Sequence, residues 1–171
     1  GGGALGASVV ETLLARGAIC HVPMRERELP PSFALASHER VSATAGVDLT
    51  EEDAVASYYD SLPPLWGSIH LAGGFAMGAV AETSLDQFQR MWNLNAVTCF
   101  LSCREAVRAC KRAGAGGRIV NVAARVIAQP AAHMVAYTAS KAGVAAITQA
   151  LAAEVIADGI RSRLAAGEFA S

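Results

Sequence analysis

Short apolar runs alternate with longer segments of helical periodicity along this chain. Four runs have the length and composition of buried strands, at 18–22, 41–47, 68–72 and 118–122. Four segments carry apolar residues at helical spacing, at about 7–16, 51–61, 84–112 and 137–157. Strand and helix alternate with short connections, so we predict an α/β protein with a Rossmann-type doubly wound parallel sheet. Its 171 residues are the size of one domain, expected at 1–171.

Local signals place the helix ends. Gly17 and Gly159 are expected to stop the helices that precede them. Thr50 is expected to cap the second helix, with Asp53 completing a capping box. Thr83 or Ser84 is expected to cap one long helix that continues to about Arg112.

The N-terminus is a glycine-rich turn that leads into a helix, with glycine at positions 1, 2, 3 and 6. Free backbone N–H groups at such a helix start can hold a pyrophosphate, and glycine allows its close approach. A flexible tail explains the same glycines equally well. Arg25 follows the strand at 18–22, where a dinucleotide fold places an adenosine 2′-phosphate; a solvated charged loop is the alternative.

Two further patterns point to chemistry. Gly73 and Gly74 follow a predicted strand directly, which indicates close approach of the backbone to a ligand. Tyr137 and Lys141 are four residues apart at the start of an apolar helix, so they share one helix face. A neighbouring ammonium lowers the pKa of a phenol and suits it to general acid–base catalysis. By itself this spacing is also common by chance.

Composition and charge exclude several classes of protein. The net charge is −1 and no apolar run reaches about 18 residues, so neither nucleic acid nor a membrane is expected as a partner. Cys20, Cys99, Cys103 and Cys110 form no C-x-x-C pair. Cys99 and Cys103 share a helix face, but no histidine lies near them in sequence. We therefore expect buried free thiols, a cytoplasmic location and no metal.

The motifs, taken together, resemble those of the short-chain dehydrogenase/reductase family up to about Arg161. Gly6 matches the cofactor turn, with Ala4 in place of the middle glycine, and Asp48 stands in an Asp-Leu-Thr context. His70-Leu-Ala-Gly73 partly matches the family's Asn-Asn-Ala-Gly motif. Asn95, Tyr137 and Lys141 match the catalytic asparagine and the Tyr-x-x-x-Lys pair, and Gly159-Ile-Arg161 matches the opening of the next strand.

The resemblance implies hydride transfer between a nicotinamide cofactor and a small carbonyl or alcohol substrate. Tyr137 would be the proton donor in reduction, Lys141 would lower its pKa and hold the nicotinamide ribose, and Asn95 would position a water. NAD or NADP is expected, with a slight preference for NADP because Met24 replaces an acidic residue and Arg25 follows it. The expected cofactor-binding residues are Gly2, Gly3, Leu5, Gly6, Arg25, Asp48, Leu49, Ala72, Gly73, Gly74, Tyr137 and Lys141.

The catalytic serine of the family, thirteen residues before the tyrosine, is replaced by Ala124. Loss of such a hydrogen-bond donor costs on the order of a hundredfold in rate. Two alternatives follow: an enzyme similar to dihydropteridine reductases, which share an Ala-Gly-Gly turn, or a cofactor-binding homologue without turnover.

The resemblance also implies an incomplete sheet, lacking the family's first strand and its C-terminal strands. A central parallel strand is buried on both faces, so its absence is expected to lower stability. Family members associate through the two long helices at 86–112 and 137–157, so a homodimer or homotetramer is expected.

Overall fold

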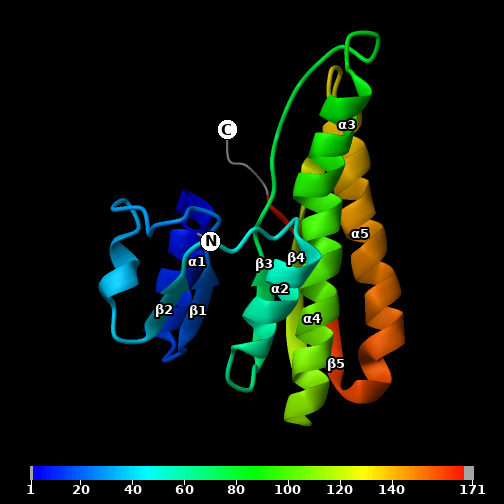
Figure 1. Cartoon of the computed structure of the whole chain (residues 1–171). Coiled ribbons are helices and arrows are strands. Elements are labelled where there is room, and N and C mark those ends of the chain that lie inside the picture. The colour runs from blue at the N-terminus through cyan, green and yellow to red at the C-terminus, as the bar shows by residue number, and fades with distance from the viewer. Residues whose placement is uncertain (1, 168–171) are drawn as a thin grey trace. The chain divides into compact units, whose positions relative to one another are not determined.

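The structure is a computed structural model that describes residues 2–167. The chain divides into two compact units, Gly1–Leu62 and Pro63–Ser171, which we describe separately. The helices are α1 (Ala4–Ala15), α2 (Glu52–Asp60), α3 (Leu85–Trp92), α4 (Thr98–Ala113) and α5 (Val135–Val155) (Figure 1). The strands are β1 (Cys20–Pro23), β2 (Val41–Thr44), β3 (Gly67–His70), β4 (Gly117–Ala124) and β5 (Ile160–Gly167).

The N-terminal unit has its own small core. β1 and β2 are parallel neighbours, with Cys20 opposite Val41 and Pro23 opposite Thr44. One face of α1 packs against β1 because its apolar residues recur at helical spacing. The buried cluster comprises Val10, Leu14, Cys20, Val22, Met24 and Phe33.

The expected capping box at Thr50 is wrong. α2 begins at Glu52 with Glu51 as its N-cap residue, and no side chain caps it. Thr50 instead donates from its backbone N–H and its hydroxyl to Oδ1 of Asp48, at 2.9 and 2.7 Å. The Asp48 carboxylate, two residues before Thr50, accepts both hydrogen bonds. Residues 48–50 therefore form a side-chain-stabilised turn that precedes the helix.

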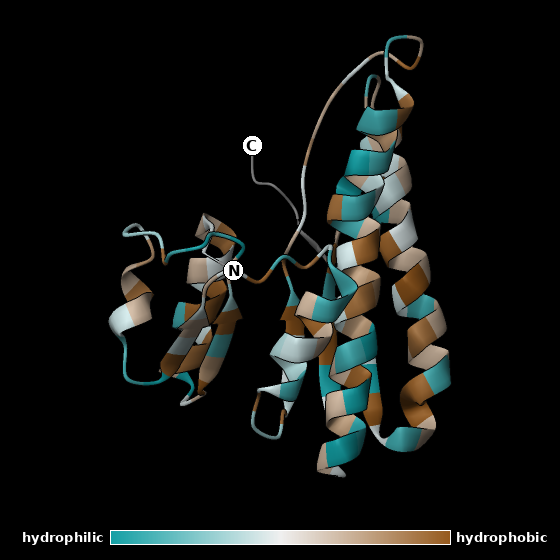
Figure 2. Cartoon of the chain, viewed as in Figure 1, coloured by the Kyte–Doolittle hydropathy of each residue, from teal (hydrophilic) through white to brown (hydrophobic). Residues whose placement is uncertain are grey.

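The C-terminal unit is a three-stranded parallel sheet covered by helices. The strand order is β3-β4-β5, and α4 and α5 lie against it (Figure 1). Ile119 of β4 and Ile160 of β5 are fully buried. Figure 2 shows few strongly hydrophilic positions along α5, whose only charged residues are Lys141 and Glu154. Buried α/β packing of this kind explains the near-continuous apolar runs.

The segment predicted as one long helix, 84–112, contains a break in its helical geometry. Ser84 caps α3, as the sequence indicates, and the structure adds Gln87, which completes a capping box with it. At Asn93–Val97 the backbone forms one π-turn before α4 begins. π-turns inside helices are frequent at functional sites. α4 ends at Ala113, and its C-cap residue Gly114 has a φ of 69°, which suits a residue without a side chain.

The predicted α/β class and parallel strand pairing are confirmed. Over residues 2–167 the strands form one two-stranded sheet and one three-stranded sheet. This agrees with the expectation of a partial sheet. β5 continues to Gly167, beyond the opening segment Gly159–Arg161 that the sequence indicated. None of the helices within residues 2–167 combines the length and the apolarity that a membrane crossing requires.

Candidate active site

Asn95 lies at the π-turn and is almost fully buried, with 1% of its surface exposed. Its Nδ2 donates to the carbonyl oxygens of Gly74 and Met91, at 3.0 and 3.1 Å. Its Oδ1 accepts the N–H of Gly74 at 3.1 Å. The extra residue in the π-turn turns this side chain toward the segment after β3, and the hydrogen bonds fix it there.

Ser140 on α5 also belongs to this hydrogen-bonded group. Nδ2 of Asn95 lies 3.0 Å from Oγ of Ser140, which itself donates to the Tyr137 carbonyl at 2.8 Å. Ser140 is completely buried. Sequence analysis did not single it out; its position inside Tyr-Thr-Ala-Ser-Lys was the available signal.

The glycine pair after β3 is needed because Leu94 and Asn95 of the π-turn come so close. A Cβ at Gly73 would lie 2.6 Å from Oδ1 of Asn95 and 3.4 Å from Nζ of Lys141. A Cβ at Gly74 would lie 2.7 Å from Cδ1 of Leu94. The glycines therefore permit close packing against protein side chains, in addition to the ligand approach that the sequence suggested.

Lys141 is 8% exposed, and its Nζ donates to the Val122 carbonyl of β4 at 3.0 Å. Burial lowers the pKa of Lys141 below its ordinary value, and the neighbouring Cys99 partly opposes this. The strand carbonyl thus orients the ammonium beside Gly73.

Tyr137 lies in the first turn of α5, and its ring meets Phe75 edge-on, with ring centroids 4.9 Å apart. The expectation that Lys141 lowers the tyrosine pKa is wrong for this structure. Burial raises the pKa of Tyr137 above its ordinary value. The Lys141 ammonium is bonded to the Val122 carbonyl instead, so the desolvation of the phenol dominates.

Ala124 ends β4 and is 7% exposed. Its methyl group offers no hydrogen bond. The following residue, Arg125, donates from Nε to Oε1 of Gln129 at 2.7 Å.

A small cavity of about 40 Å³ lies between the segment 76–78, α3 and the start of α5. Gln87, His133 and Ala136 are among the residues that line it.

The remaining predicted residues lie in the N-terminal unit, except for Ala72, which directly precedes Gly73. Gly2 and Gly3 precede α1, whose N-terminus has no side-chain cap. Leu5 is exposed and Gly6 is buried within α1. Gly1 of the same turn lies outside the described residues.

Asp48 and Arg25 interact within the N-terminal unit. Hydrogen bonds from the Thr50 side chain and backbone hold the pKa of Asp48 below its ordinary value, and the Arg25 charge adds to this effect. Arg25 itself is exposed just after β1, and Leu49 follows Asp48. The carboxylate is therefore ionised and oriented at neutral pH.

Comparison with known proteins identifies the family. The sequence model described as short chain dehydrogenase matches residues 1–167, and the chain belongs to this family. A short-chain type dehydrogenase/reductase of Picea abies is 34% identical over 114 residues, covering 63% of this chain and 42% of the relative. The chloroplastic NADPH-dependent aldehyde reductase 2 of Arabidopsis thaliana is 30% identical over 115 residues, covering 63% and 42%.

The fold agrees with solved structures. Sorbitol-6-phosphate 2-dehydrogenase from Erwinia amylovora superimposes with a TM-score of 0.88 at 25% identity, covering 96% of this chain and 67% of that one. The match covers 42% of each of the two curated relatives above, so the chain spans less than half of their length.

Proposed function

We propose that this chain is part of an oxidoreductase that transfers a hydride between NAD(H) or NADP(H) and a small carbonyl or alcohol substrate. One observation carries the proposal: Asn95, Ser140 and Lys141 are buried and hydrogen-bonded around the turn that holds Tyr137. Membership of a family whose relatives are named dehydrogenases and reductases supports it.

The residues present fit a nicotinamide dinucleotide. The N-terminus of α1 has no side-chain cap, and a Cβ at Gly3 would meet nothing within 4 Å. We propose that the backbone of Gly2, Gly3, Leu5 and Gly6 binds the diphosphate there. Asp48, with Leu49, would accept a hydrogen bond from the adenine amino group.

The C-terminal unit would hold the nicotinamide end. When bound, the nicotinamide supplies or accepts the hydride. Lys141, oriented by the Val122 carbonyl, would donate hydrogen bonds to the ribose hydroxyls. The backbone of Ala72, Gly73 and Gly74 would line the same side, held in position by Asn95.

Tyr137 would move the proton. Because burial raises its pKa, the phenol is protonated at neutral pH and ready to donate to the substrate oxygen in reduction. Asn95 would keep the backbone after β3 in place and position a water near Lys141. A preference for NADP would come from Arg25, whose guanidinium can pair with a 2′-phosphate.

A second candidate function rests on Ala124. Without a hydroxyl at the end of β4, a substrate carbonyl lacks the donor that the family's serine supplies. The chain would then bind the cofactor without turning over substrate.

Binding and turnover by the whole chain test these proposals. NADH or NADPH fluorescence should change on binding, and a panel of aldehydes and ketones should then oxidise the reduced cofactor. Tyr137→Phe should abolish turnover but keep cofactor binding. Tyr58→Phe is a matched control, because the buried Tyr58 hydroxyl has no hydrogen-bond partner to lose. Failure to bind either cofactor, or an unchanged rate in Tyr137→Phe, would overturn the proposal.

A further inference from the structure

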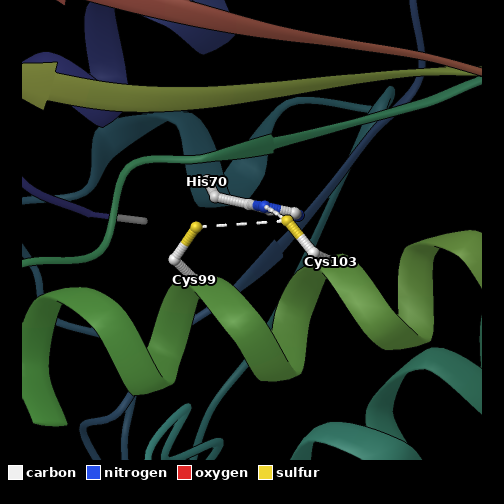
Figure 3. Close-up of side chains that lie close together, drawn as sticks. All are labelled: His70, Cys99 and Cys103. Carbon is white, nitrogen blue, oxygen red and sulfur yellow. Dashed lines mark hydrogen bonds between the residues drawn. The ribbon is translucent and has the colours of Figure 1, made fainter. Parts of the chain in front are cut away.

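A second cluster of reactive side chains lies in the C-terminal unit, formed by His70 at the end of β3 and by Cys99 and Cys103 on α4. Figure 3 shows both sulfurs pointing from one face of the helix toward the imidazole. The two Sγ atoms are 4.0 Å apart, and Sγ of Cys103 lies 3.5 Å from Nδ1 of His70. All three potential ligand atoms lie within 4.8 Å of one another.

The fold, rather than the local sequence, brings the histidine to the cysteines. His70 and Cys103 are 33 positions apart, and α4 packs directly on β3. Cys99 and Cys103 occupy successive turns of α4 and are 5% and 2% exposed. A sequence search for nearby histidines therefore misses this arrangement.

We propose that His70, Cys99 and Cys103 bind one Zn²⁺ ion that ties α4 to β3. Two sulfurs about 2.3 Å from one Zn²⁺ at tetrahedral angles lie about 3.8 Å apart, and a sulfur and a nitrogen about 3.5 Å apart. The observed 4.0 and 3.5 Å are close to these separations, and the third pair, Cys99 and His70, lies within 4.8 Å.

The surroundings of His70 suit a ligand. Nε2 of His70 lies 2.9 Å from Oγ of Ser68, which can accept an N–H when Nδ1 faces the metal. Metal-binding histidines regularly use their second nitrogen in this way. Binding would replace the 2.7 Å hydrogen bond between Nδ1 and Oδ1 of Asn121.

Asn121 would be retained close to the metal after that exchange. Its Nδ2 donates to Oγ1 of Thr148 at 2.9 Å, which anchors the amide from the side of α5. Its Oδ1, 3.4 Å from Sγ of Cys103, can then complete the fourth position. Asn121 itself is fully buried.

Coordination geometry and ligand type favour zinc. Two sulfurs, one imidazole nitrogen and one amide oxygen fill the four positions of a tetrahedral Zn²⁺ site. Thiolates and imidazoles are common ligands of Zn²⁺, whereas Mg²⁺ and Ca²⁺ prefer oxygen ligands.

Metal titration of the whole chain tests the proposal. The chain is kept reduced, stripped with a chelator and titrated with Co²⁺ as a spectroscopic probe, then with Zn²⁺. We expect thiolate-to-Co²⁺ charge-transfer bands and tetrahedral d–d bands that Zn²⁺ abolishes, at one ion per chain by native mass spectrometry. Zn²⁺ should also raise the melting temperature.

Variants assign the ligands. Cys99→Ser, Cys103→Ser and His70→Gln should each abolish the Co²⁺ thiolate bands or weaken Zn²⁺ binding strongly, and Ser68→Ala should weaken it about tenfold. Cys110→Ser is the matched control, because Cys110 is equally buried on α4 but outside the cluster; it should bind as the parent does.

A measurement on the parent chain avoids variants that fail to fold. Zn²⁺ should protect Cys99 and Cys103, but not Cys20 or Cys110, from alkylation in mild denaturant, as mapped by mass spectrometry. Equal protection of all four cysteines, no binding of Zn²⁺, or binding of Cu⁺ alone would overturn the zinc site and leave a group of buried free thiols.

Discussion

The side chain of Asn95 joins three segments that are far apart in sequence. It bonds the backbone of Gly74 after β3, the carbonyl of Met91 on α3 and the hydroxyl of Ser140 on α5. Each of these hydrogen bonds contributes to the stability of the fold. Loss of the buried amide would leave its partners unsatisfied, which costs free energy.

Asn95→Ala should therefore destabilise the chain by about 2–3 kcal/mol, since it leaves the Gly74 N–H and carbonyl unsatisfied. Chemical denaturation followed by circular dichroism measures this change. Asn93→Ala, at an exposed position of the same π-turn, is the control and should change stability little. Equal losses in the two variants would show that helix propensity, not the hydrogen bonds, matters.

Ala124→Ser should raise turnover with carbonyl substrates by about tenfold to a hundredfold, because it supplies a donor at the end of β4. Steady-state rates with NADH and NADPH measure the effect. Ala123→Ser is the control: successive strand residues face opposite sides, so its hydroxyl points away from the Ala124 side. If Ala124→Ser binds cofactor and still shows no turnover, the non-catalytic alternative gains support.

The pH profile should follow the raised pKa of Tyr137. Alcohol oxidation needs the phenolate as base, so its rate should still be rising with pH near the ordinary tyrosine value of about 10. Phe75→Ala uncovers the ring, lowers the Tyr137 pKa and should move this rise to lower pH. Phe100→Ala, which removes an exposed ring on α4, should leave the profile in place.

At the scale of elements, α3 and α5 approach each other at a glycine. A Cβ at Gly143 would lie 3.0 Å from Cη2 of Trp92 and 3.3 Å from the Ala96 methyl group. The small residue lets the helix carrying Tyr137 and Lys141 pack beside the one that leads to Asn95.

Gly143→Val should separate these helices and cost about 1–3 kcal/mol through overpacking. It should also reduce turnover, because the relative positions of the two helices set the site. Ala146→Val, at an exposed position of α5, controls for β-branched propensity and should have a small effect. Thermal unfolding and steady-state kinetics on both variants separate packing from propensity.

Prediction from sequence succeeded where one local pattern determines one element. The apolar runs located β1 to β4, and Ser84, one of the two expected caps, is the N-cap residue of α3. The π-turn at Asn93–Val97 was not predictable, because the apolar pattern does not determine whether the backbone hydrogen bonds within a helix run i→i+4 or i→i+5. The Thr50 capping box failed because the Asp48 carboxylate accepts the Thr50 N–H, which the Asp53 carboxylate would have accepted in the box.

The sequence predicted which residues belong to the candidate site, but not how their side chains interact. Tyr137 and Lys141 share the start of one helix, as their spacing requires. Spacing gave no information on burial, so it predicted the wrong direction for the Tyr137 pKa. His70 was missed as a neighbour of Cys103 because β3 and α4 meet only in the folded chain.

At the scale of the molecule, the chain divides between Leu62 and Pro63 into two compact units. The prediction of a single domain is open to a direct measurement. Both tryptophans, Trp66 and Trp92, belong to the second unit, so their fluorescence reports its unfolding alone.

Met24→Ala should cost about 2–5 kcal/mol in the core of the first unit, where Met24 is 1% exposed. We expect the circular-dichroism transition to move to lower temperature more than the tryptophan transition does. Val144→Ala, in the core of the second unit, should move the tryptophan transition. Coincident shifts of both probes in both variants would instead establish one cooperative domain.

The way Asn95 and Lys141 are held has an evolutionary consequence. Most of their partners are backbone atoms: the N–H and carbonyl of Gly74 and the carbonyls of Met91 and Val122. Backbone atoms are the same for every amino acid, so substitutions at Met91 or Val122 preserve these bonds while the chain path is kept. A lineage can thus exchange a residue such as the one at Ala124, and later restore it, while the positions of its asparagine and lysine persist.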